Sequence, residues 1–120
     1  MTSKKLAETI ARLTLNKQAE DVLILDLRKI TTLTDFFVIC SGGTEIHLKA
    51  ITDAVLDGLV EYKIKPWHKE GIGNKTWILL DFVDVVLHIF NSETRDFYQL
   101  ERLWGDAPVT SVNDNTNTEE

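Results

Sequence analysis

The residues whose types and spacing best suit chemistry form a serine–glycine–glycine–threonine turn at residues 41–44, between a predicted strand and a predicted helix. Glycines leave backbone N–H groups open, and the N-terminus of a helix attracts anions. Nucleotidyltransferases use a turn of this kind, followed by paired carboxylates on the next strand that hold a divalent metal ion. The turn here contains no lysine of the kind found in P-loops.

The carboxylates that would complete such a site are Asp81 and Asp84. They stand three residues apart across a predicted turn, so they do not alternate along one strand face as an Asp-x-Asp pair would. A tight strand-to-helix turn is therefore the favoured interpretation of residues 41–44. A nucleotidyltransferase-like enzyme, or a nucleotide-binding protein that uses this turn, remains the alternative.

Metal and thiol chemistry have less support in the sequence. The histidines His47, His68 and His88 fall in three different predicted elements, and no H-x₃-H or C-x₂-C spacing occurs. The single cysteine, Cys40, lies in the apolar run FFVIC, which predicts a small buried hydrophobic group and not a reactive thiolate. We therefore predict no catalytic residue and no metal site.

The composition indicates one globular domain with a negative charge. The chain has 120 residues, of which 43% are hydrophobic and 27% charged, and its formal charge is −6 with histidine neutral. Affinity for nucleic acid comes largely from lysine and arginine side chains that neutralise phosphates, and this chain has no basic run. A basic protein partner therefore fits the charge better than free nucleic acid does.

The sequence predicts a cytoplasmic protein with no membrane segment. No apolar run approaches the roughly 20 residues that span a bilayer. The N-terminal sequence MTSKKLAETIARL lacks the apolar core, about 7–15 residues long, of a signal peptide.

Hydrophobic periodicity predicts the element order α-β-β-α-β-β-β-α. This order indicates a compact α/β domain with a mixed β-sheet of about five strands and helices packed on its faces. Residues 1–106 are predicted to form the domain, and the polar, acidic residues 107–120 are typical of a disordered tail. Helices are predicted at residues 4–18, from the cap Thr44 to residue 61, and from the cap Ser92, and strands at residues 21–27, 36–41, 66–69, 75–81 and 84–90.

Two patterns predict which side chains share a face. Ile51 and Val55 belong to a stripe at helical spacing that should face the core. In the last predicted strand, Val86, His88 and Phe90 alternate with their neighbours, so they should share one sheet face, with His88 half-buried.

The predicted last helix contains more aromatic and charged residues than a core requires. Phe97 and Leu100 fall on its core side, which leaves Tyr98, Glu101, Arg102 and Trp104. Tryptophan and tyrosine are enriched among the residues that dominate binding energy at interfaces. The group therefore indicates a contact surface, either for a partner or, as an alternative, for a second copy of the chain in a dimeric scaffold.

Three segments in order resemble the ribosomal silencing factors, the Iojap-related family. The resemblance covers residues 4–106 and is carried by LTDFFVICSGGTEIHLKAITD, TWILLDFVDVVLHIF and TRDFYQLERLWGD, the last being the most specific. It implies a nucleotidyltransferase-like topology without the active site. It also implies a protein that binds ribosomal protein fourteen of the large ribosomal subunit, blocks joining of the small subunit and represses translation when nutrients are short. Members of the family often form homodimers in isolation, and no cofactor is involved.

The chain departs from the family pattern at two places that bear on function. The family commonly has an arginine immediately before His47, where this chain has Ile46, and a glycine in the hairpin turn where this chain has Val83. Ile46 weakens any role assigned to that arginine, and Val83 predicts a turn of a different type. Neither departure touches the terminal helix.

The implied function predicts six partner-contacting residues. They comprise three aromatic anchors, two acidic residues that face basic side chains, and one histidine that positions a hydrogen bond at the sheet surface. In that order they are Trp77, Tyr98 and Trp104; Asp81 and Glu101; and His88.

Overall fold

The computed structural model of the chain describes residues 1–73, 76–93, 95, 102 and 104–113. Within these residues the helices are α1 (Ser3–Leu15), α2 (Glu45–Gly58) and the short 3-10 helix η1 (Val60–Tyr62). The strands are β1 (Glu20–Asp26), β2 (Phe36–Gly42), β3 (His68–Glu70), β4 (Trp77–Asp81), β5 (Val85–Asn91) and β6 (Val109–Val112).

The six strands form one mixed sheet in the order β3-β4-β5-β2-β1-β6. β2 and β5 run parallel in its interior, and the four other neighbouring pairs are antiparallel. The prediction of a compact α/β domain with a mixed sheet is therefore confirmed. The sheet has one strand more than predicted, because β6 was not expected.

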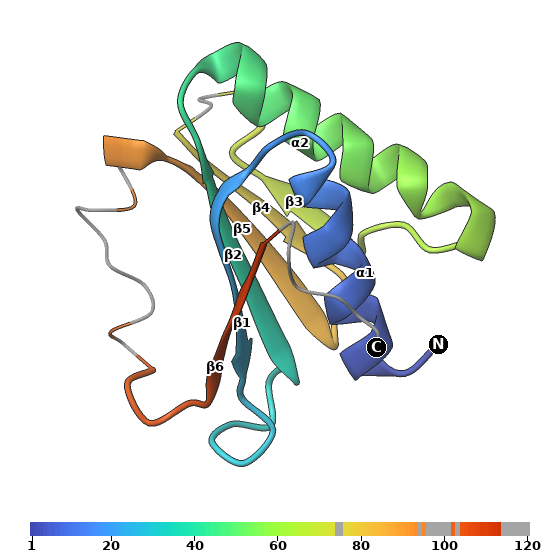
Figure 1. Cartoon of the computed structure of the whole chain (residues 1–120). Coiled ribbons are helices and arrows are strands. Elements are labelled where there is room, and N and C mark those ends of the chain that lie inside the picture. The colour runs from blue at the N-terminus through green and yellow to red at the C-terminus, as the bar shows by residue number, and fades with distance from the viewer. Residues whose placement is uncertain (74–75, 94, 96–101, 103, 114–120) are drawn as a thin grey trace.

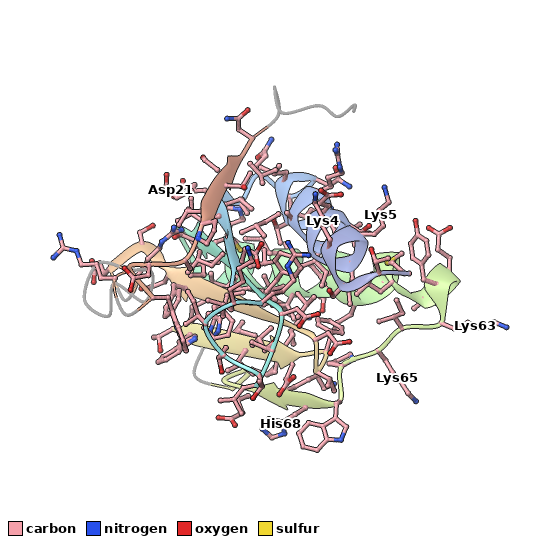
Figure 2. The ribbon with its side chains drawn as sticks, turned by 90° about the horizontal axis from the view of Figure 1, so that it is seen from below. Lys4, Lys5, Asp21, Lys63, Lys65 and His68 are labelled. Carbon is pink, nitrogen blue, oxygen red and sulfur yellow. The ribbon has the colours of Figure 1, made fainter. Side chains whose placement is uncertain are left out.

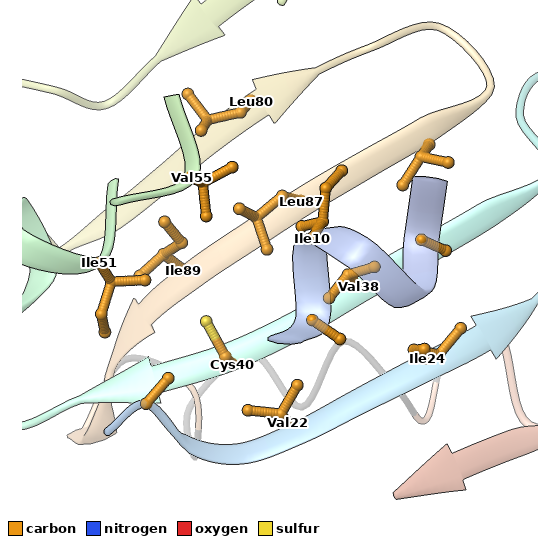
Figure 3. Packing of buried hydrophobic residues seen from close by; sticks show 14 of the residues in the cluster. Ile10, Val22, Ile24, Val38, Cys40, Ile51, Val55, Leu80, Leu87 and Ile89 are labelled. Carbon is orange, nitrogen blue, oxygen red and sulfur yellow. The ribbon is translucent and has the colours of Figure 1, made fainter. Parts of the chain in front are cut away.

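Helices α1 and α2 lie together on one face of the sheet (Figure 1). Thr44 caps α2 as predicted, since its side-chain oxygen accepts a hydrogen bond from the His47 N–H. The predicted stripe of α2 is also confirmed, because Ile51 and Val55 are fully buried in the larger core, against side chains of β2 and β5 (Figure 3). No helix among the described residues has the length and apolar character needed to cross a membrane.

The opposite face of the sheet carries a second, smaller core. α1 and α2 do not contribute to it, and the helix predicted from Ser92 falls largely outside the described residues. This face is therefore only partly closed by the described residues. Its buried members are Leu25, Leu27, Ile39, Phe90 and Ala107, with Leu23, Phe37, Trp77 and Trp104 packed against them and partly buried.

The prediction that residues 107–120 are a disordered tail is wrong for residues 109–112. These residues form β6, which pairs antiparallel with β1 and places Val112 opposite Val22 and Val109 opposite Leu25. An unpaired edge of β1 would expose a row of N–H and C=O groups. The backbone of residues 109–112 forms hydrogen bonds with these groups, and this pairing does not require apolar side chains. Residues 114–120 lie outside the described residues.

The pairing of β6 predicts unequal effects of two identical substitutions. Val112 is 9% exposed and Val109 is 51% exposed. Val112→Ala should lower the free energy of unfolding by roughly 1–2 kcal/mol, because it removes buried apolar surface. Val109→Ala, which makes the same change of strand propensity, should lower it by less than about 0.5 kcal/mol. Urea denaturation followed by tryptophan fluorescence measures both, and equal values would contradict the pairing.

Candidate functional site

The face of the sheet opposite the two long helices collects three of the predicted contact residues. Strand register places Trp77 opposite Phe90, and Asp81 opposite Val86, with His88 between Val86 and Phe90 on the same face. The predicted alternation of β5 is thus confirmed. We call this surface the open face and define it by Phe37, Trp77, Asp81, Val86, His88 and Phe90.

His88 is held by a hydrogen bond inside this face. The Trp77 Nε1–H donates to His88 Nδ1 over 3.1 Å, so the neutral ring carries its proton on Nε2. His88 is 4% exposed, and burial lowers its pKa to about 4. The prediction of a half-buried histidine at the sheet surface is therefore wrong: the side chain is buried and bonded to Trp77. Its Nε2–H has no hydrogen-bond partner among the described residues.

Aromatic rings join the two predicted tryptophan anchors on this face. The Phe37 and His88 ring centroids are 4.5 Å apart, and those of Phe37 and Trp104 are 5.8 Å apart, both edge to face. Trp77 packs on Phe90 at 4.9 Å. The structure thus joins Trp77 to Trp104 through the predicted contact residue His88 and through Phe37, which the sequence analysis did not select. The predicted anchors Tyr98 and Glu101 lie outside the described residues and stay predictions.

A hollow of about 460 Å³ opens beside this cluster. Its lining includes Phe37, Asp81 and Trp104, and also three apolar side chains that the sequence analysis did not select, Leu33, Trp67 and Val83. We call these three the rim; they are 84%, 76% and 54% exposed, respectively. Exposed large apolar side chains gathered at one place are typical of interaction sites.

Asp81 and Val83 form a strained turn at the edge of the hollow. Val83 has a φ of 76°, and the Asp84 N–H donates to the Phe82 carbonyl over 3.0 Å, which closes a three-residue γ-turn around Val83. The Asp81 carboxylate accepts a hydrogen bond from the Val83 N–H over 2.7 Å. A β-branched residue rarely adopts positive φ, so Val83 occupies a backbone conformation that favours glycine.

The glycine turn at residues 41–44 is occupied by its own hydrogen bonds. The Gly43 N–H donates to His47 Nδ1, and His47 Nε2 therefore donates to the Lys17 carbonyl. The Thr44 hydroxyl accepts a hydrogen bond from the His47 N–H. The N–H groups of Gly43 and His47, which an anion at this turn would need, are therefore already bonded. β2 and β5 are parallel, so this turn after β2 and the Asp81–Asp84 turn before β5 lie at opposite ends of strands about 20 Å long. The geometry therefore favours a helix cap over a nucleotide site.

The remaining candidates for chemistry are dispersed. Each histidine has a hydrogen-bond partner of its own. The His68 ring bonds the Glu70 carboxylate at 2.7 Å, whereas the His88 ring bonds the Trp77 indole. Within the described ranges, no three histidine, cysteine, aspartate or glutamate side chains gather to hold a metal ion. Cys40 is fully buried in the larger core, as predicted, and burial raises the pKa of its thiol to about 12 (Figure 3).

The sequence matches, over residues 1–120, the family described as "Ribosomal silencing factor during starvation". The chain belongs to this family. A Bacillus subtilis relative named ribosomal silencing factor RsfS is 37% identical over 112 residues, which cover 93% of this chain and 95% of that protein. The predicted family is thereby confirmed.

Two further proteins extend the comparison of this ribosomal silencing factor family member. A crystal structure of a Chromobacterium violaceum protein superposes with a TM-score of 0.84 and 28% identity, covering 88% of each chain. A Mus musculus protein named mitochondrial assembly of ribosomal large subunit protein 1 is 33% identical over 91 residues, which cover 73% of this chain and 40% of that protein. The compact α/β fold is therefore shared with a solved structure.

The buried histidine of this silencing factor predicts a pH-dependent stability. Its folded pKa of about 4 lies below the ordinary value of 6.5, so the unfolded chain binds the proton more tightly. Stability is complete above about pH 6.5 and falls as the pH drops toward 4, by about 2 kcal/mol between pH 7.5 and 5. Urea titrations of wild type and His88→Gln at both values measure this difference. An equal loss in the two proteins would exclude His88 as its source.

The strained turn predicts that glycine stabilises the fold. Val83→Gly relieves the positive φ of a β-branched residue, which should raise the free energy of unfolding by about 1 kcal/mol after the entropy cost of glycine. The matched substitution Val85→Gly, in the adjoining strand, should lower stability because Val85 is fully buried. A decrease for Val83→Gly in the same urea titration would contradict the strain.

Proposed function

We propose that this ribosomal silencing factor binds the large ribosomal subunit through ribosomal protein fourteen and sterically blocks joining of the small subunit. It would thereby repress translation in the cytoplasm when nutrients are short. The observation that carries the docking site is the open face, where Phe37 and Trp77 are only half-buried beside a hollow with an exposed apolar rim. The family and the names of its relatives support action on the ribosome.

Charge supports a basic protein as the partner on this face. The net charge of −6 attracts basic proteins and repels RNA phosphates in general. Asp81 places a carboxylate at the hollow. Lys4, Lys5 and Lys63 extend into solvent near α1 and η1, and His68 projects from the other side of the molecule (Figure 2). Overall charge therefore favours a basic partner, and Asp81 supplies an acidic group at the open face.

The proposed mechanism requires occupation of a surface and no reaction. A bound protein that covers part of the surface where the subunits meet prevents their contact by volume exclusion. Affinity then depends on a few apolar anchors, and opposite charge raises the association rate. A homodimer would have to leave the open face available, or dissociate, before docking.

Sedimentation of purified ribosomal subunits tests this function. Added protein should co-migrate with the large subunit and reduce the fraction of joined ribosomes. Trp67→Ala should weaken binding about tenfold or more with little change in stability, because Trp67 is exposed and part of the rim. Val60→Ala is the matched control, since it shortens an exposed apolar side chain on η1.

Two outcomes would contradict the proposal separately. Unchanged subunit joining at saturating wild-type protein would exclude the silencing mechanism. Equal binding by Trp67→Ala and Val60→Ala would show that docking uses another surface.

A further inference from the structure

Arg95 is a buried cation at the start of the C-terminal segment. Its side chain is 7% exposed, whereas Arg12 on α1 and Arg28 after β1 are exposed. An arginine keeps its charge in proteins, so its burial costs free energy unless hydrogen bonds replace the water that the guanidinium group loses. The acceptors around Arg95 therefore indicate why the fold buries it.

The Arg95 guanidinium group joins two strands. Its Nη1 donates to the Asp21 carbonyl oxygen over 2.6 Å and to the Ser41 hydroxyl oxygen over 2.9 Å. The Glu20 carbonyl oxygen lies at 3.5 Å, the limit of a hydrogen bond. Hydrogen bonds from a charged donor are stronger than those between neutral groups. Arg95 thus ties the start of β1 to the end of β2, and we call Arg95, Asp21 and Ser41 the clamp.

The clamp closes on an irregular part of the sheet. Between the pairs Glu20–Ser41 and Leu23–Ile39, β1 advances three residues and β2 only two, so β1 contains a bulge. Asp21 lies in this bulge with a φ of 50°, in the left-handed region. A bulge interrupts the ladder of backbone hydrogen bonds between strands. The buried guanidinium group donates to a backbone carbonyl at that interruption.

The bulge also lies beyond the cover that β6 gives to β1. β6 pairs with β1 from Val22 to Leu25, so within the described chain this pairing stops before Asp21. The side chain of Arg95 therefore bonds β1 at the point where strand pairing ends.

Ser41 places the clamp on the same side of the sheet as the open face. Phe37 and Ile39 belong to the smaller core on that side, and alternate residues of a strand share a face. Trp104 packs on Phe37, which lies four residues from Ser41 along β2, a distance of about 13 Å. Arg95 and Trp104 are therefore anchored at two places along one strand.

The residues from Arg95 to Trp104 include three of the predicted partner contacts. Tyr98, Glu101 and Trp104 all follow Arg95 within this part of the sequence. Binding costs less conformational entropy when the chain that carries the contacts is already held in place. A buried cation at one end and an aromatic contact at the other supply two such restraints.

We propose that Arg95 is a positioning residue for ribosomal silencing. The clamp fixes the start of the segment that carries the predicted contacts, so the free protein already holds that segment as binding requires. Arg95 itself does not contact the partner, because its side chain is buried. This inference rests on the proposed function, because it names the residue that prepares the protein for it.

The first test observes the indole N–H signals of the free protein by NMR. Arg95→Met keeps an unbranched apolar stem and removes the hydrogen bonds of the clamp. The Trp104 signal should shift, because its packing on Phe37 depends on the anchored segment. The Trp77 signal should keep its position, because Trp77 lies on β4 and its indole bonds His88.

A purely structural role for Arg95 gives a different result. It would lower the thermal midpoint but leave both indole signals unchanged at temperatures where the variant is folded, and this outcome would overturn the proposal. Arg12→Met is the matched control, since Arg12 is exposed on α1, which covers the opposite face. It should move neither signal.

Binding to purified large ribosomal subunits gives the second readout, at a temperature where every variant is folded. Arg95→Met should weaken binding about tenfold or more, and Arg12→Met should stay within about twofold of wild type. Arg95→Lys keeps the charge but lacks the guanidinium fork, so its affinity should lie between those of wild type and Arg95→Met. Equal affinity of Arg95→Lys and Arg95→Met would overturn the role given to the charge-assisted clamp.

Ser41→Ala tests whether Arg95 acts through the clamp. It should weaken binding about threefold alone and cause no further loss when combined with Arg95→Met, because both remove the same hydrogen bond. Fully additive losses would overturn the clamp. Ser41→Ala is also the smaller change, so it tests the proposal even if Arg95→Met does not fold.

The failures of the two proposals are distinguishable. Absence of wild-type binding to the large subunit would overturn the proposed function, while the Trp104 signal would still report whether Arg95 positions the segment. Wild-type binding that is equally strong in Arg95→Met and Arg12→Met would overturn the positioning role and leave the function standing.

Discussion

The parallel pairing of β2 with β5 is the interaction on which the rest of the structure depends. The two strands align from Phe36 opposite Val85 to Gly42 opposite Asn91, and nearly all their side chains are buried. Strands buried on both faces require cover on both sides of the sheet. Helices α1 and α2 supply that cover on one side (Figure 1). On the other side the same strands present Phe37, His88 and Phe90 to a smaller core that the described residues close only in part.

The parallel pairing also places the two polar turns at opposite ends of the sheet. Because β2 and β5 are parallel, the glycine turn lies at one end of the sheet, where the Thr44 hydroxyl caps α2 and the Gly43 N–H donates to the His47 ring. The hairpin turn of Asp81 and Val83 lies at the other end, beside the hollow. The carboxylates of Asp81 and Asp84 therefore do not meet the glycine turn. The residues that remain exposed together are apolar, with one acidic group among them, which suits recognition of a protein surface better than catalysis.

The sequence predicted the features that depend on the spacing of neighbouring residues. The features that it missed depend on contacts between segments that are distant in the sequence. The helical stripe of Ile51 and Val55 and the alternation of β5 are periodicities, so sequence alone located them. β6 was missed because its pairing depends on the free edge of β1, which no local composition reveals. Leu33 and Trp67 were missed for the same reason: each stands in a polar stretch, and only the fold brings them to one hollow. A lone tryptophan after Pro66, with charged neighbours, was the one available signal.

The two faces of the sheet differ in how well their buried polar groups are satisfied. Under the helices, the hydroxyls of Thr14 and Thr52 donate to backbone carbonyls of their own helices. On the open face, the Thr34 hydroxyl and the His88 Nε2–H have no partner among the described residues. Beside them stands Val83, the one β-branched residue with positive φ in the described chain. Unsatisfied groups and backbone strain persist where function requires them and the surrounding structure supplies the stability. The two unsatisfied groups and the strained Val83 lie on the face with the exposed rim, which is physically consistent with a surface whose contacts are completed by a bound protein.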